Sequence, residues 1–99
     1  MFGYYRVASA VNKTIVANPR KNAEEILKLI KEAHSKEVSV IVFPELCLTG
    51  YTASDLLLNQ TLIASQNESF HYILNNIKEI NTIAIVGIAV FEADRLYNC

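Results

Sequence analysis

Residues 38–51 read VSVIVFPELCLTGY, and this stretch carries the main evidence for the fold. Its first part, residues 38–43, is a short, apolar and largely β-branched run, which is typical of a strand buried on both faces of a parallel sheet. Pro44 has no backbone N–H and ends this strand. Glu45 therefore follows directly after a strand, at the edge where open α/β sheets bind their ligands.

Helical patterns lie on both sides of this strand. Asn18 stands before a proline, which is a helix-start signal, and apolar residues recur at helical spacing from there to about residue 36. Asn22 and Glu25 form a second possible cap pair one turn later. Beyond the strand, a second apolar stripe predicts a helix over residues 62–80.

Three further strands complete the pattern. Residues 4–11 and 83–91 are rich in β-formers, and residues 95–99 read as the start of one more strand, reached through a tight turn at 92–95. The loop before the second helix contains a possible helical turn at 54–58. Alternating strands and helices predict an α/β layered fold with a largely parallel sheet.

Composition narrows the classes of function. The 99 residues are 52% hydrophobic and carry a net charge of −1, so a packed soluble domain is expected and a disordered chain is not. Lysines alternate with glutamates along the first helix, so no basic patch for nucleic acid is predicted. Residues 83–91 form the longest apolar run, too short for a membrane helix of about 20 residues. With two cysteines and no signal segment, a cytoplasmic location is expected.

Few side chains outside residues 38–51 suggest chemistry. Glu92 follows the second apolar strand, but Glu45 is the stronger candidate because the preceding proline fixes its position. Cys47 lies near Glu45, whose charge would suppress a thiolate, so a buried structural thiol is favoured over a nucleophile. His34 and His71 lie on predicted helices without further ligands at metal-binding spacing, so packing or surface roles are favoured and no metal site is predicted.

The segment VIVFPELCLTGY at 40–51 resembles the first catalytic motif of the nitrilase, or carbon-nitrogen hydrolase, superfamily. The Phe-Pro-Glu tripeptide after an apolar strand and the following Thr-Gly-Tyr carry this resemblance, which extends over essentially the whole chain. Two stretches, FGYYRVA at 2–8 and TGYTASDLL at 49–57, resemble glutamine-dependent NAD synthetases more narrowly. The expected fold is part of an α-β-β-α nitrilase-type sandwich, strand-helix-strand-helix-strand with the start of an antiparallel hairpin strand.

The resemblance implies a mechanism and a site. The family hydrolyses an amide with a Glu-Lys-Cys triad, in which Glu45 would be the general base and Tyr51 would line the glutamine pocket. The lysine would stabilise the tetrahedral oxyanion and the cysteine would form a thioester. Ammonia would then pass to a second domain that uses ATP and magnesium to make NAD from nicotinic acid adenine dinucleotide.

The sequence also departs from the family pattern. The family lysine lies just beyond the strand that begins at Leu96 and the cysteine lies further on, so neither is matched here. Residues 1–99 are therefore expected to be an incomplete amino-terminal portion of a glutaminase domain, with no second domain and no cofactor of its own. The chain alone is expected to be inactive, because a base without its nucleophile cannot run covalent catalysis. The expected partners are glutamine, the carboxy-terminal part of the same protein and further copies in a homo-oligomer.

Three alternatives remain open at this point. The chain could come from another carbon-nitrogen hydrolase, such as an amidase or carbamoylase. It could be a non-catalytic truncated product that self-associates through an unpaired sheet edge. It could also be an unrelated flavodoxin-like binding module. In the nitrilase fold residues 96–99 run antiparallel to the preceding strand, whereas a doubly wound fold would continue into a helix.

Overall fold

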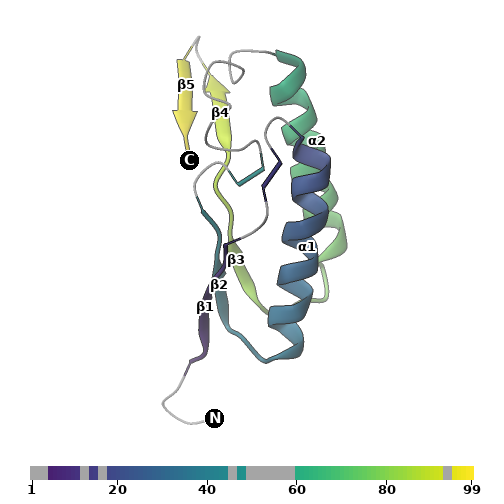
Figure 1. Cartoon of the computed structure of the whole chain (residues 1–99), viewed down its shortest axis with the longest axis vertical. Coiled ribbons are helices and arrows are strands. Elements are labelled where there is room, and N and C mark those ends of the chain that lie inside the picture. Colours follow the sequence, from purple (N-terminus) through teal and green to yellow (C-terminus); the bar gives the residue numbers. More distant parts are fainter. Residues whose placement is uncertain (1–4, 12–13, 16–17, 45–46, 49–59, 93–94) are drawn as a thin grey trace.

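A computed structural model of the chain describes residues 5–11, 14–15, 18–44, 47–48, 60–92 and 95–99. The elements follow in the order β1 (Val7–Ser9), α1 (Pro19–Ser35), β2 (Val40–Val42), α2 (Gln60–Asn76), β3 (Ile83–Ile85), β4 (Ala89–Glu92) and β5 (Arg95–Asn98). The first three strands form a parallel sheet in the order β1-β2-β3, and β4 pairs with β5 in antiparallel fashion (Figure 1). The predicted α/β class is confirmed.

Both helices cover the same face of the parallel sheet (Figure 1). The strand order advances in one direction, and right-handed crossovers then place both connecting helices on one side. Ala8, Ile41 and Ala84 are register partners across the three strands and belong to the core beneath the helices. Ile26, Ile30 and Ile73 supply the largest aliphatic side chains that the helices bury there.

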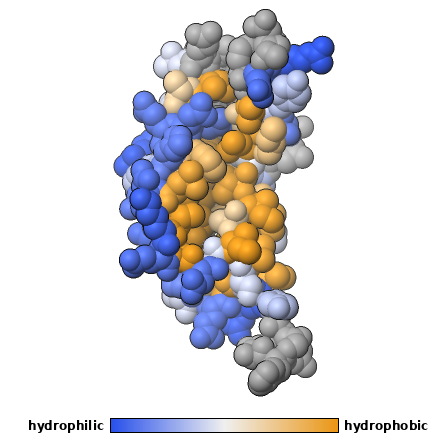
Figure 2. Space-filling view, turned by 180° about the vertical axis from the view of Figure 1, so that it is seen from behind, coloured by the Kyte–Doolittle hydropathy of each residue, from blue (hydrophilic) through white to orange (hydrophobic). Residues whose placement is uncertain are grey.

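The opposite face of the sheet is apolar, and no described part of the chain covers it. Val7, Val42, Ile83 and Ile85 are between 41% and 70% exposed, although they lie within strands. They alternate with the core-facing residues, as the two-residue period of a strand requires. In the space-filling view from behind, hydrophobic surface runs along the molecule beside the hydrophilic surface of the helical side (Figure 2).

The start of α1 agrees with the helix signals. The side chain of Asn18 accepts a hydrogen bond from the backbone N–H of Lys21 at 3.3 Å, and Pro19 occupies the first turn. The helix ends at Ser35, one residue before the predicted end. Glu37 follows with a φ of 58°, in the left-handed region where chains commonly leave a helix.

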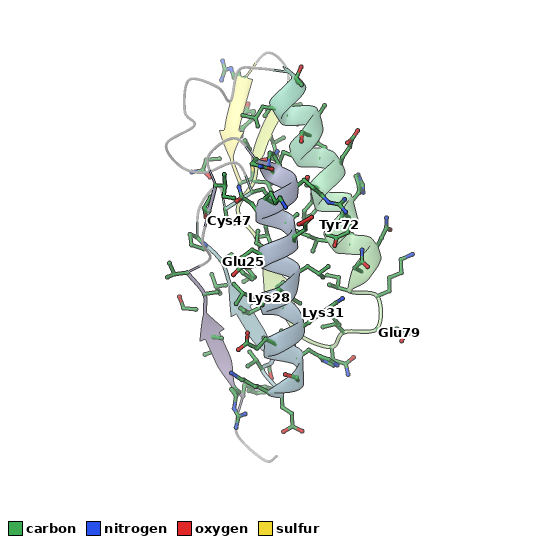
Figure 3. The ribbon with its side chains drawn as sticks, turned by 45° about the vertical axis from the view of Figure 1, so that its right-hand side comes forward. Glu25, Lys28, Lys31, Cys47, Tyr72 and Glu79 are labelled. Carbon is green, nitrogen blue, oxygen red and sulfur yellow. The ribbon has the colours of Figure 1, made fainter. Side chains whose placement is uncertain are left out.

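The second helix differs more from its prediction. It begins at Gln60 and ends at Asn76, whereas the apolar stripe predicts residues 62–80. Ile77 and Ile80 still pack against the core, because the turn that follows the helix keeps them on the same side. The guanidinium of Arg20 in α1 lies 3.7 Å from the ring centroid of Tyr72 in α2, which links the two helices (Figure 3).

The predicted strand at 83–91 is two strands in the structure. β3 pairs with β2 in the parallel sheet, and after residues 86–88 the chain continues as β4, which pairs with β5. The antiparallel β4–β5 pair is the arrangement that distinguishes the nitrilase fold from a doubly wound one. β1 is also shorter than the predicted 4–11. The helical turn expected at 54–58 lies outside the described residues.

Among the described residues, neither helix combines the length and the apolar character that crossing a bilayer would require.

Candidate active site at the carboxyl edge of the sheet

The candidate site lies where β2 and β3 end side by side. The backbone N–H of Phe43 donates a hydrogen bond to the carbonyl oxygen of Ile85 at 2.9 Å, and the Phe43 side chain is buried. Pro44 follows and is exposed. The point where the Phe-Pro-Glu segment leaves the sheet is therefore anchored to the neighbouring strand. Glu45 and Tyr51, the two predicted site residues, lie outside the described residues.

Cys47 is a buried thiol just after this point. Its side chain is 1% exposed, and its Sγ lies 3.6 Å from the carbonyl oxygen of Gly87, to which the thiol donates a hydrogen bond (Figure 3). Burial raises the pKa of Cys47, and the backbone hydrogen bonds only partly oppose this shift. The thiol is therefore neutral near pH 7 and is a poor nucleophile. The prediction that Cys47 is buried is confirmed.

Asn22 has a different role from the one its sequence context suggested. It lies one turn inside α1 and is completely buried, so the cap-pair prediction for Asn22 and Glu25 is wrong. Its Oδ1 accepts a hydrogen bond from the N–H of Ile15 at 2.7 Å. Its Nδ2 donates to the carbonyl oxygens of Ile15 at 2.7 Å and Leu48 at 2.6 Å. Helix capping is a local interaction, whereas these partners belong to two other segments.

Gln66 is the corresponding buried amide in α2. Its Nε2 donates to the carbonyl oxygen of Ala89 at 2.6 Å, and its Oε1 accepts from the N–H of the same residue at 2.8 Å. The side chain is completely buried and ties α2 to the first residue of β4. Sequence reasoning missed both amides. The available signal was a polar residue on the apolar stripe of each helix, which is uncommon unless its hydrogen bonds are satisfied.

The end of β5 returns to the same edge. Ile88 and Cys99 exchange two backbone hydrogen bonds of 2.8 Å each. An open hollow of about 280 Å³ lies between Phe43, residues 85–87 and residues 98–99. Three chain segments thus meet at the carboxyl edge of the sheet: the end of β2, the end of β3 and the end of β5.

Glu92, the second carboxylate considered, does not belong to this edge. Because the apolar run is divided, Glu92 ends β4 and is paired in register with Arg95 in the hairpin. A larger cleft of about 790 Å³ lies at the opposite edge, between the amino ends of the strands and the end of α1, with Arg6, His34 and Asn81 in its lining. That cleft contains no residue selected as a candidate from the sequence.

The comparison with known protein families agrees with this geometry. The family described as carbon-nitrogen hydrolase matches residues 6–99, almost the whole chain. The chain belongs to the carbon-nitrogen hydrolase family. The nitrilase-type resemblance seen in the Phe-Pro-Glu and Thr-Gly-Tyr motifs is thereby confirmed.

Relatives that resemble this chain include glutamine-dependent NAD(+) synthetases. That of Mycobacterium leprae is 30% identical over 96 residues, which is 97% of this chain and 14% of the relative. That of Aquifex aeolicus is 37% identical over 83 residues, which is 84% of this chain and again 14% of the relative. This carbon-nitrogen hydrolase chain therefore spans about one seventh of the length of the curated relatives it matches.

A solved structure has the same fold. The crystal structure of a glutamine-dependent NAD(+) synthetase from Cytophaga hutchinsonii matches 96% of this chain and 16% of its own length, with a TM-score of 0.86 and 27% identity. The narrower resemblance to NAD synthetases and the nitrilase-type fold are both confirmed by these matches.

Proposed function

We propose that this chain is the amino-terminal part of a glutaminase domain that, in a longer polypeptide, hydrolyses glutamine to supply ammonia for ATP-dependent NAD synthesis. The observation that carries the proposal is the family match over residues 6–99, together with the position of Phe43 and Pro44 at the carboxyl edge of a parallel sheet. That edge is where α/β sheets place their ligands. Relatives that match most of this chain are glutamine-dependent NAD(+) synthetases.

In this proposal Glu45 is the general base. Its carboxylate takes the proton of a cysteine thiol, the thiolate attacks the amide carbon of glutamine, and the C–N bond breaks as ammonia leaves with the proton. Glu45 then takes a proton from water, which attacks the thioester and releases glutamate and the thiol. A lysine stabilises the oxyanion of both tetrahedral intermediates, and Tyr51 lines the glutamine pocket.

The nucleophile is a cysteine other than Cys47. The Cys47 thiol is buried, donates to the carbonyl oxygen of Gly87, and has a raised pKa. The motif match assigns no catalytic role to Cys99 either. The lysine and the cysteine of the triad would then come from chain beyond residue 99, and residues 1–99 alone would not hydrolyse glutamine.

The geometry at Cys99 supports this division of the site. Cys99 pairs with Ile88 and shares the hollow with Phe43, the last buried residue before Pro44. From this hollow at the end of β2, a longer chain would continue in the direction of β5. A lysine shortly after that strand could therefore reach the oxyanion position beside Glu45.

The uncovered sheet face supports a larger domain. Burying a Val or Ile side chain stabilises a protein by about 1.5–3 kcal/mol. Val7, Val42, Ile83 and Ile85 all leave much of that stabilisation unrealised in this chain. We propose that the second sheet of an α-β-β-α sandwich covers this face. A second domain would bind ATP and magnesium, and the complete protein would form a cytoplasmic homo-oligomer.

A chimera tests the proposed function. Residues 1–99 replace the matched segment of the Cytophaga hutchinsonii synthetase, and glutamate release from glutamine is measured beside NAD synthesis from added ammonium. The chimera is expected to hydrolyse glutamine, and Glu45→Gln is expected to abolish hydrolysis while ammonium-dependent NAD synthesis continues. The ammonium assay reports folding independently of the glutaminase site. A chimera that uses ammonium but not glutamine, or one that tolerates Glu45→Gln, would contradict the proposal.

The same chimera tests whether the chain comes from another carbon-nitrogen hydrolase. If the segment belongs to an amidase or carbamoylase branch, the chimera should hydrolyse other amides or N-carbamoyl compounds in preference to glutamine.

The exposed apolar face favours one alternative, in which the chain is a non-catalytic product that self-associates. A non-catalytic chain would bury that face by self-association. Sedimentation of residues 1–99 over a hundredfold concentration range would then show reversible oligomers, with no activity recovered in the chimera.

A further inference from the structure

The side chain of Asn22 bonds to the backbone of two segments outside its own helix. Its carboxamide is completely buried, and all three of its hydrogen bonds go to backbone atoms outside α1. Two bonds hold Ile15, in the connection between β1 and α1. The third holds the carbonyl oxygen of Leu48, 26 residues away in the segment that follows β2. One side chain on the helix thus links the two loops that leave the carboxyl edge of the sheet.

The Leu48 contact limits where the Phe-Pro-Glu segment can go. Leu48 lies three residues after Glu45, and Phe43, two residues before it, is bonded to Ile85. A residue of extended chain spans at most about 3.6 Å, so anchors this close restrict the position of everything between them. Leu48 is also completely buried, which adds a packing constraint to the hydrogen bond from Asn22.

We propose that Asn22 is a positioning residue for the general base, acting through Leu48 to hold the segment that carries Glu45. The proposal rests on the assignment of Glu45 under the proposed function. A general base must approach its proton to hydrogen-bond distance, and a misplacement of about 1 Å can lower a rate roughly 100-fold. The amide of Asn22 is completely buried and its polar atoms are bonded to backbone, so it is not placed to contact substrate itself. Its effect is on where the carboxylate stands.

Gln66 provides a matched control. It is also a completely buried amide on a helix, and it also satisfies its polar atoms on backbone, at Ala89. Its partner belongs to β4 and not to the segment after β2. Removing either amide leaves buried backbone groups unpaired, so both substitutions destabilise the protein by the same physical mechanism. Only the loss of Asn22 releases Leu48.

The first test measures the accessibility of Cys47 in residues 1–99. Cys47 is buried next to Leu48, whereas Cys99 is exposed and reacts with a thiol reagent as an internal reference. Asn22→Ala is expected to speed labelling of Cys47 at least about tenfold at low denaturant, through local opening of this segment. The control is Thr82→Ala, which removes a buried hydroxyl bonded to Val38 at the opposite edge of the sheet. Equal labelling of Cys47 in the two variants, once compared at equal global stability, would overturn the proposal.

The second test measures catalysis in the chimera with the Cytophaga hutchinsonii synthetase. Asn22→Ala is expected to lower kcat for glutamine hydrolysis roughly 100-fold with KM changed less than about threefold. Gln66→Ala is expected to leave kcat within about threefold, and both variants should retain ammonium-dependent NAD synthesis. Equal kcat for Asn22→Ala and Gln66→Ala would mean a structural role only. Full activity of Glu45→Gln would refute the proposed function, whereas an inactive Glu45→Gln beside a fully active Asn22→Ala would refute only the role of Asn22.

Discussion

Ile88 and Cys99 exchange two backbone hydrogen bonds of 2.8 Å, which hold the end of β5 beside the carboxyl edge of the parallel sheet. This pairing brings the antiparallel strands to the same hollow as Phe43. It extends the β4–β5 pairing by one residue pair beyond Ala89 and Asn98. Any residue supplied by chain beyond β5 would therefore enter the candidate site from a defined direction.

A proline at position 99 should change the direction in which chain beyond β5 enters the candidate site. Cys99→Pro removes the N–H that donates to Ile88, and a lost backbone hydrogen bond costs about 0.5–1.5 kcal/mol. In the chimera, glutamine hydrolysis should fall while ammonium-dependent NAD synthesis persists. Cys99→Ser keeps the donor and is the control. Equal hydrolysis by the two variants would show that this pairing does not place the site.

The cap of α1 should contribute measurably to stability. Asn18→Ala removes the acceptor for the N–H of Lys21 and should lower the free energy of unfolding by about 0.5–2 kcal/mol, nearer the lower value because the bond is 3.3 Å long. Urea denaturation followed by circular dichroism measures the change. Asn18→Asp retains the acceptor and should behave like the unaltered chain, and a loss in that variant as large as in Asn18→Ala would argue against the cap.

The pH dependence of stability should reveal the buried thiol. Burial raises the pKa of Cys47 in the folded state, so the folded chain holds this proton more tightly than the unfolded chain does. The stabilisation is complete below the unfolded pKa of about 8.5 and is lost as pH rises through the higher folded pKa. Unfolding free energy should therefore fall more steeply from pH 8 to pH 10 in the unaltered chain than in Cys47→Ala. Parallel curves of unfolding free energy against pH for the two chains would rule out a raised pKa of Cys47.

A charge on the uncovered sheet face should affect only the larger assembly. Ile83 is 63% exposed in this chain, so Ile83→Lys should change the unfolding free energy of residues 1–99 by no more than about 0.5 kcal/mol. In the chimera the same lysine would be buried without a partner, and folding or solubility should fail. Ile41→Lys, on the face beneath the helices, should prevent folding of residues 1–99 and of the chimera alike. A soluble, active Ile83→Lys chimera would mean that this face stays open.

The local parts of the fold were predictable from the sequence. Asn18, Pro19 and the apolar spacing placed α1 to within one residue, because helix caps and periodicity depend on neighbours within a few positions. Residues 38–43 identified β2 for the same reason, although the strand itself covers only Val40–Val42. The Phe-Pro-Glu and Thr-Gly-Tyr motifs identified the family. The assignments of Glu45 and Tyr51 remain predictions.

Tertiary structure decided what depended on distant partners. The run at 83–91 is divided because β3 pairs with β2 and β4 pairs with β5. Which strands pair is not encoded in local periodicity. Asn22 was predicted to be a cap, yet its amide bonds Ile15 and Leu48, because a buried polar group must be satisfied by whatever backbone the fold brings near. The sequence alone thus determined α1, the position of β2 and the family. The contacts that hold the candidate site exist only once distant segments pack together.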